Sequence, residues 1–118
     1  HRLKEYIKRY NIVLTSWYPL GGRGYITDHL HNEMIVNMSN TYKKTPAQII
    51  LRWQLQSGNI SVPGSSNLLH IRQNYDIFDF ELSCSEIKEI RKLNKKQPYF
   101  TMTYEEQEKN FLSWKLED

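Results

Sequence analysis

The sequence has very little cysteine and no long apolar run, and both shortages narrow the class of protein it belongs to. Cys84 is the only cysteine among 118 residues, so an internal disulfide and a CxxC metal site are excluded. Such a chain is typical of a reducing compartment, and we expect a cytoplasmic protein. No stretch approaches the roughly 20 apolar residues of a membrane span, and no signal-peptide pattern opens the chain, so we expect no membrane partner.

A strong excess of charge is also absent. The 16 basic and 13 acidic residues give a net charge of +3 with mixed signs, which does not indicate a nucleic-acid partner. The segment RLKEYIKRY mixes basic and aromatic residues as a nucleic-acid surface does, but its apolar spacing favours an outer helix with a solvated face. The length fits one small domain. The chain starts at His1 inside an amphipathic pattern, and we expect a piece of a longer protein or a processed product.

Apolar periodicity and turn residues predict strands that alternate with helices. Residues 12–17, IVLTSW, are typical of a strand buried on both faces, and residues 59–62 form a second strand. Capping boxes at Thr45–Gln48 and Ser83–Glu86 begin two helices, and Gly58 ends the first. Further helices are predicted near residues 3–10, 34–42, 68–75 and 105–114. This order predicts an α/β fold of parallel units, and because two strands alone leave their edges unpaired, it indicates part of a larger sheet.

Two turns follow the carboxyl ends of the predicted strands, where parallel β/α folds place their sites. One is the glycine-rich LGGRG at residues 20–24, and the other is GSSN at residues 64–67. A phosphate often binds after the seventh and eighth strands of a β/α barrel, on the N-terminus of a short helix. The alternative is that Asn67 caps that helix and the serines only form the turn. The local pattern leaves both interpretations open.

These residues resemble the aldo-keto reductases. The likeness is carried by TPAQIILRWQLQSGNISVPGSSN, then IRQNYDIFDFELSCSEIKEI, and upstream by IVLTSWYPLGGRG. The resemblance implies a (β/α)8 TIM barrel that reduces small carbonyl substrates with NADPH. Residues 1–94 would span the end of the sixth helix to the last helix, with strands 7 and 8, and residues 95–118 would form the substrate-loop tail. The family's catalytic Asp, Tyr, Lys and His would lie upstream, so we assign no catalytic residue and expect the chain to need the missing N-terminal half of the barrel.

The resemblance implies cofactor-binding roles for individual residues. Trp17 would stack on the nicotinamide, although a core tryptophan at a strand end is the alternative. Leu20 and Gly21 would cover the pyrophosphate, and Asn74 would contact the adenine. The adenosine phosphate would be held by Ser65, Ser66 and Asn67.

Three positions depart from the family pattern. Gly64 stands where many relatives have lysine, His70 where they have arginine, and Gln73 where a glutamate is frequent. Since a neutral imidazole does not replace a guanidinium, we expect weaker discrimination between NADPH and NADH. Arg72 and the helix N-terminus remain as sources of positive potential.

The tail matches the family's variable substrate segment. Tyr99 and Phe100 would line the substrate pocket there, or would only pack against the barrel. The remaining alternatives concern the chain as a whole. It would act as the C-terminal segment of an oxidoreductase, as a truncated inactive fragment with a structural or interaction role, or as a half-barrel that regains activity with a partner chain.

Other candidate groups carry weaker indications. His29 and His31 lack the carboxylate or cysteine that would complete a metal site, so a solvated loop or a helix cap is expected. Tyr18 lacks a basic partner for proton donation. Cys84 is interpreted as a helix residue rather than a nucleophile.

Overall fold

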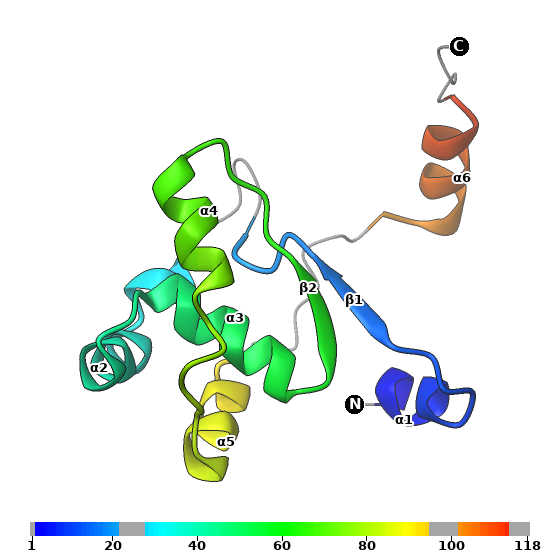
Figure 1. Ribbon diagram of the computed structural model, residues 1–118. Coiled ribbons are helices and arrows are strands. Elements are labelled where there is room, and N and C mark those ends of the chain that lie inside the picture. Colours follow the sequence, from blue (N-terminus) through cyan, green and yellow to red (C-terminus); the bar gives the residue numbers. More distant parts are fainter. Residues whose placement is uncertain (1, 22–27, 95–101, 114–118) are drawn as a thin grey trace.

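The computed structural model describes residues 2–21, 28–94 and 102–113. The elements are, in order, α1 (Arg2–Lys8), β1 (Leu14–Trp17), the 3-10 helix η1 (Asp28–His31), α2 (Glu33–Tyr42), α3 (Pro46–Gln56), β2 (Asn59–Val62), α4 (Leu68–Tyr75), α5 (Cys84–Lys92) and α6 (Tyr104–Leu112). Figure 1 shows α2, α3, α4 and α5 gathered at one side of the two strands, with α6 standing apart from the other elements.

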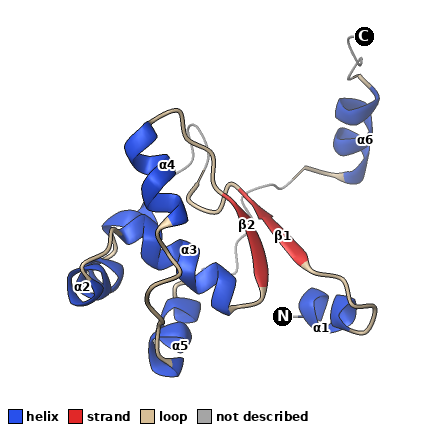
Figure 2. Ribbon diagram, in the orientation of Figure 1, coloured by secondary structure: helices blue, strands red, loops and turns tan. Residues whose placement is uncertain are grey.

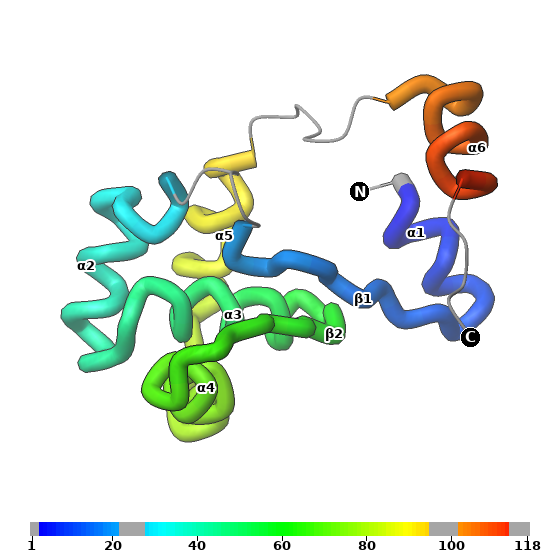
Figure 3. Tube along the Cα trace, turned by 90° about the horizontal axis from the view of Figure 1, so that it is seen from above, coloured from blue at the N-terminus to red at the C-terminus, as the bar shows by residue number. Residues whose placement is uncertain are grey.

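The two strands are parallel, as the alternating order of elements predicts. Leu14 pairs with Asn59 and Trp17 with Val62. The ribbon in Figure 2 and the tube in Figure 3 both show α3 beside β2. The carboxyl ends of both strands therefore meet at the same edge of the sheet. Because α3 precedes a strand of this parallel pair, its N-terminus also lies toward that edge.

The prediction that residues 12–17 form a strand buried on both faces is wrong in two respects. The strand begins at Leu14, and Ile12 and Val13 lie outside it and are more than half exposed. On the sheet face turned away from α3, Trp17 is 69% exposed and Val62 is 52% exposed. An apolar run shows which side chains favour burial, but burial also needs a second layer, and the described residues cover this face incompletely.

Local signals place the start of α3 and of α5 as expected, whereas α1 ends at Lys8, before the predicted residue 10. Thr45 and Gln48 form a reciprocal capping box at the start of α3, and Ser83 and Glu86 form another at α5. Gly58 follows the end of α3 with a φ of 73°, a left-handed conformation that glycine adopts at little cost. The sequence pattern does not predict the 3-10 helix η1, since it favours a solvated loop or a helix cap for His29 and His31.

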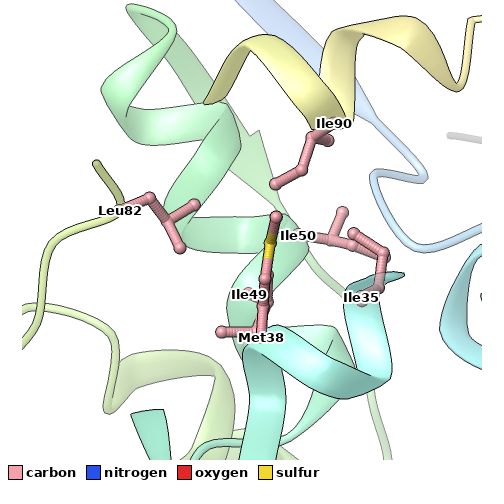
Figure 4. Packing of buried hydrophobic residues seen from close by; sticks show 6 residues of the cluster. All are labelled: Ile35, Met38, Ile49, Ile50, Leu82 and Ile90. Atoms are coloured by element: carbon pink, nitrogen blue, oxygen red, sulfur yellow. The ribbon is translucent and has the colours of Figure 1, made fainter. Parts of the chain in front are cut away.

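The hydrophobic core lies between helices rather than on the sheet. Figure 4 shows side chains from α2, α3 and α5 converging with one from the segment that precedes α5. The cluster consists of Ile35, Met38, Ile49, Ile50, Leu82 and Ile90. Tyr42 links two of these helices, because its hydroxyl donates to Glu86 Oε2 at 2.8 Å. Burial and this bond raise the pKa of the Tyr42 phenol.

The irregular segment 76–82 is held against α3 by polar side chains one helical turn apart. Gln48 Nε2 donates to the Asp76 carbonyl at 2.7 Å, and Arg52 donates to the Ile77 carbonyl at 3.2 Å. The Gln56 side chain pairs with both the N–H and the carbonyl of Leu82, at 2.8 and 2.9 Å. We call Gln48, Arg52 and Gln56 the α3 ladder. It supplies the partners that buried backbone groups without secondary structure require.

In the described part of the chain, no helix combines the length and apolar character needed to cross a membrane.

Candidate functional site

The loop after β1 leaves the sheet through a tight turn. The Gly21 N–H donates to the Tyr18 carbonyl at 3.0 Å, with Pro19 and Leu20 between them. Tyr18 and Gly21 both have positive φ, at 50° and 88°, and this conformation is costly for a tyrosine. The Trp17 and Tyr18 rings lie 4.3 Å apart. The turn directs Leu20 back toward the helices, where it packs against the core.

The turn after β2 caps α4 with its own side chains. Asn67 Oδ1 accepts from the N–H of Leu69 at 2.8 Å and of His70 at 3.4 Å. The Ser65 hydroxyl accepts from the Asn67 N–H at 3.1 Å. The interpretation of Asn67 as a helix cap is therefore confirmed. Two donors at the start of α4 are already bonded within the protein, so an anion seated there would rely on other donors of the turn or displace the cap.

A cavity of about 280 Å³ lies where these two turns approach the start of α3. The predicted cofactor residues that line it are Leu20, Gly64, Ser65, His70, Gln73 and Asn74. Trp17, Gly21, Ser66 and Asn67 are not among the described lining residues. The structure thus brings the two turns and one face of α4 together around one hollow.

Four further residues line the same cavity and were not predicted from the sequence. They are Leu30 of η1 and Thr45, Pro46 and Ala47 at the start of α3. The capping box at Thr45 carried a usable signal. A helix that precedes a parallel strand begins at the carboxyl edge of the sheet, where sites of β/α folds lie.

The far end of α4 is fixed by Lys44. Its ammonium group lies 2.8 Å from Asp76 Oδ2 and 2.7 Å from Asp79 Oδ2, and it stands over the Phe80 ring at 5.6 Å. Hydrogen bonds to Asp76 and Asp79 raise the pKa of Lys44, and the Lys44 bond lowers the pKa of Asp79. Together with Gln48, which donates to the carbonyl of Asp76, this pairing holds the end of α4 and supports the orientation of Gln73 and Asn74.

The other candidate groups in the described part of the chain do not line this cavity. His29 and His31 lie in η1, and no cluster of three or more metal-ligating side chains occurs among residues 2–21, 28–94 and 102–113. Cys84 is the exposed first residue of α5, as its interpretation as a helix residue requires. Tyr99 and Phe100, the predicted substrate residues, lie outside the described residues.

The chain belongs to the aldo/keto reductase family, whose family model matches residues 1–95. It is 36% identical over 92 residues to the 9,11-endoperoxide prostaglandin H2 reductase of Trypanosoma cruzi, covering 78% of this chain and 32% of that protein. It is 41% identical over 93 residues to the glyoxal reductase of Bacillus subtilis, and the match covers 79% of this chain and 32% of that protein. The chain therefore spans about a third of the length of these curated relatives.

Solved structures give the same family. MGS-M4, an aldo-keto reductase enzyme from a Medee basin deep-sea metagenome library, matches with a TM-score of 0.79 and 36% identity over 86% of this chain and 37% of that one. A variant of Gox0644 in complex with NADPH matches with a TM-score of 0.76 and 31% identity, and the match covers 87% of this chain and 38% of that one. The family relationship implies a TIM-barrel architecture.

Proposed function

We propose that this chain forms the C-terminal part of an aldo/keto reductase barrel, with β1 and β2 as its seventh and eighth strands. Side chains that favour burial are exposed on the sheet face away from α3, where Ile60 is 51% exposed. They are also exposed on α4, at Leu68, Leu69 and Tyr75. A larger barrel would cover both surfaces, and the chain spans only about a third of the relatives it matches.

The cavity between the two turns is proposed as the seat for the adenosine and phosphate end of a nicotinamide cofactor. The single observation that carries this proposal is the convergence of Gly64, Ser65, His70 and Asn74 on one cavity. The polar groups of the described lining residues are hydroxyls, amides and the His70 imidazole, with no carboxylate among them, so no described lining anion repels a phosphate. NADPH, when bound, supplies the hydride for carbonyl reduction.

Each proposed cofactor residue would have a distinct part. Ser65 and Ser66 would donate hydroxyls to the adenosine phosphate, and Asn74 would hydrogen-bond the adenine. Asn67 caps α4 and would keep the turn in shape. Leu20 and Gly21 would cover the pyrophosphate, and the exposed Trp17 ring would be available for the nicotinamide. With Gly64, His70 and Gln73 in place of the family's charged residues, NADH would compete with NADPH.

The reaction proposed for the assembled protein is reduction of aldehydes and ketones with NAD(P)H. We assign no catalytic residue to this chain, and Tyr99 and Phe100 are proposed as part of the substrate wall. The contribution of this chain is then to orient the cofactor rather than to move the proton.

Titration with NADPH tests the cofactor seat directly. We expect NADPH to change the tryptophan fluorescence of the chain in a saturable manner, and we expect Asn74→Ala to weaken the affinity by about fivefold, as loss of one hydrogen bond does. Asn37→Ala on α2 is the matched control and should leave the affinity unchanged. A wild-type chain whose fluorescence does not respond to NADPH, with no binding by calorimetry, would contradict the proposal.

The exposed apolar sheet face favours a half-barrel that needs its other half over an enzyme that acts alone. We expect the chain alone to show no NADPH-dependent reduction of an aromatic aldehyde and to self-associate in sedimentation velocity, because unpaired strand edges and apolar patches pair between molecules. Val62→Lys should reduce the self-association. A monomeric chain that reduces the aldehyde would overturn this expectation.

A further inference from the structure

His70 is the one titratable side chain among the described residues that line the cavity between the two turns. The other described lining residues are aliphatic or carry a hydroxyl or an amide, and none of these groups changes charge near neutral pH. His70 lies in the first half of α4, and its backbone N–H donates to Asn67 Oδ1. His70 thus lies on a capped helix and lines the same cavity as Gly64 and Ser65.

The charged and titratable groups on the surrounding elements do not line this cavity. They are Tyr18 after β1, Asp28, His29 and His31 in η1, Lys43 and Lys44 before α3, Arg52 on α3, and Arg72, Tyr75, Asp76 and Asp79 on or after α4. Lys44 is engaged by Asp76 and Asp79 at 2.8 and 2.7 Å, which reduces its availability to an anion. Within the described lining, a change of charge between acidic and basic conditions therefore comes from His70.

We infer that His70 is a specificity-determining residue whose protonation makes recognition of an adenosine 2′-phosphate, and so the preference for NADPH over NADH, depend on pH. The inference rests on the proposed cofactor seat. Imidazole changes charge between about pH 5 and 8, and the imidazolium donates a charge-assisted hydrogen bond to a phosphate where the neutral ring gives a weaker one. An arginine at this position would remain charged throughout.

The test uses adenosine 2′,5′-bisphosphate and adenosine 5′-monophosphate as probes, so that the 2′-phosphate is the only difference. Their affinities for the chain are measured by titration of backbone amide NMR signals. We expect the bisphosphate preference to be about fivefold larger at about pH 5.5 than at about pH 8, the size of one partly exposed charge interaction. His70→Gln should remove this change, and His70→Arg should keep the preference high at both pH values.

The two substitutions also distinguish the contribution of the histidine to the pH dependence from that of the phosphate. The second ionisation of a phosphate lies near pH 6, and the change that it causes by itself appears in the His70→Gln variant, which carries no ionisable group at this position. If both nucleotides bind but the preference does not vary with pH, or varies as much in His70→Gln, the role of His70 is refuted and the cofactor seat stands. If neither nucleotide binds at either pH, the seat and the role of His70 fall together.

Discussion

Replacing Ile49 with alanine is expected to lower the free energy of unfolding by about 3 kcal/mol, as removal of a buried isoleucine from a packed core does. Ile49 is 0% exposed and lies in the cluster that joins α2, α3 and α5. Small domains are stable by only about 5–15 kcal/mol, so this loss is a large share of the total. Urea denaturation followed by circular dichroism should show a lower midpoint.

The matched control is Leu69→Ala on α4. Leu69 is largely exposed, and its truncation should cost under about 0.5 kcal/mol, as surface substitutions usually do. Equal midpoints for the wild type and the Ile49→Ala chain would show that the helical cluster is not the stabilising core.

The elements that the sequence predicts well are those with local signals. The helix of residues 68–75 and the strand of residues 59–62 are observed with the expected bounds. Both capping boxes form as expected. In each case the groups that decide the outcome lie within a few residues of one another, so that spacing along the chain is enough to identify them.

The parts that the sequence does not predict depend on contacts between distant residues. The segment 76–82 has no helix or strand period. The α3 side chains that bond its backbone lie 25 to 28 residues away along the chain. The same limit applies to the candidate site. Leu20 and Asn74 were placed through the family resemblance, whereas Leu30 and Ala47 enter the cavity through the packing of η1 and α3.

The exposure of one sheet face is another feature that the sequence does not predict. The apolar character of residues 12–17 predicts burial, yet burial is a property of two surfaces and the sequence of one strand specifies only its own. The exposed Trp17, Ile60 and Val62 lie on a sheet face that the described residues leave largely uncovered. This is the physical reason for proposing that the remainder of a barrel covers this face.

The α3 ladder leads to the second large expected effect, at Arg52. Arg52 is buried, with 9% of the residue exposed. Its side chain donates to the Ile77 carbonyl at 3.2 Å and to Glu81 Oε1 at 3.1 Å. The guanidinium also stands over the Phe80 ring at 5.9 Å. Arg52→Ala removes these partners and leaves a void at the base of the irregular segment. We expect a loss of about 3 kcal/mol of unfolding free energy, measured by urea denaturation.

Two further variants distinguish the hydrogen bonds of Arg52 from its charge and its volume. Arg52→Met fills the space without donating, and if the bond to the Ile77 carbonyl stabilises the chain it should still cost about 1 kcal/mol or more. Arg72→Ala, on the exposed surface of α4, is the matched control for loss of a positive charge and should change stability by under about 0.5 kcal/mol. An Arg52→Met chain as stable as the wild type would show that Arg52 holds the segment by packing rather than by its hydrogen bonds, with the Gln48 and Gln56 bonds as the polar attachments between α3 and residues 76–82.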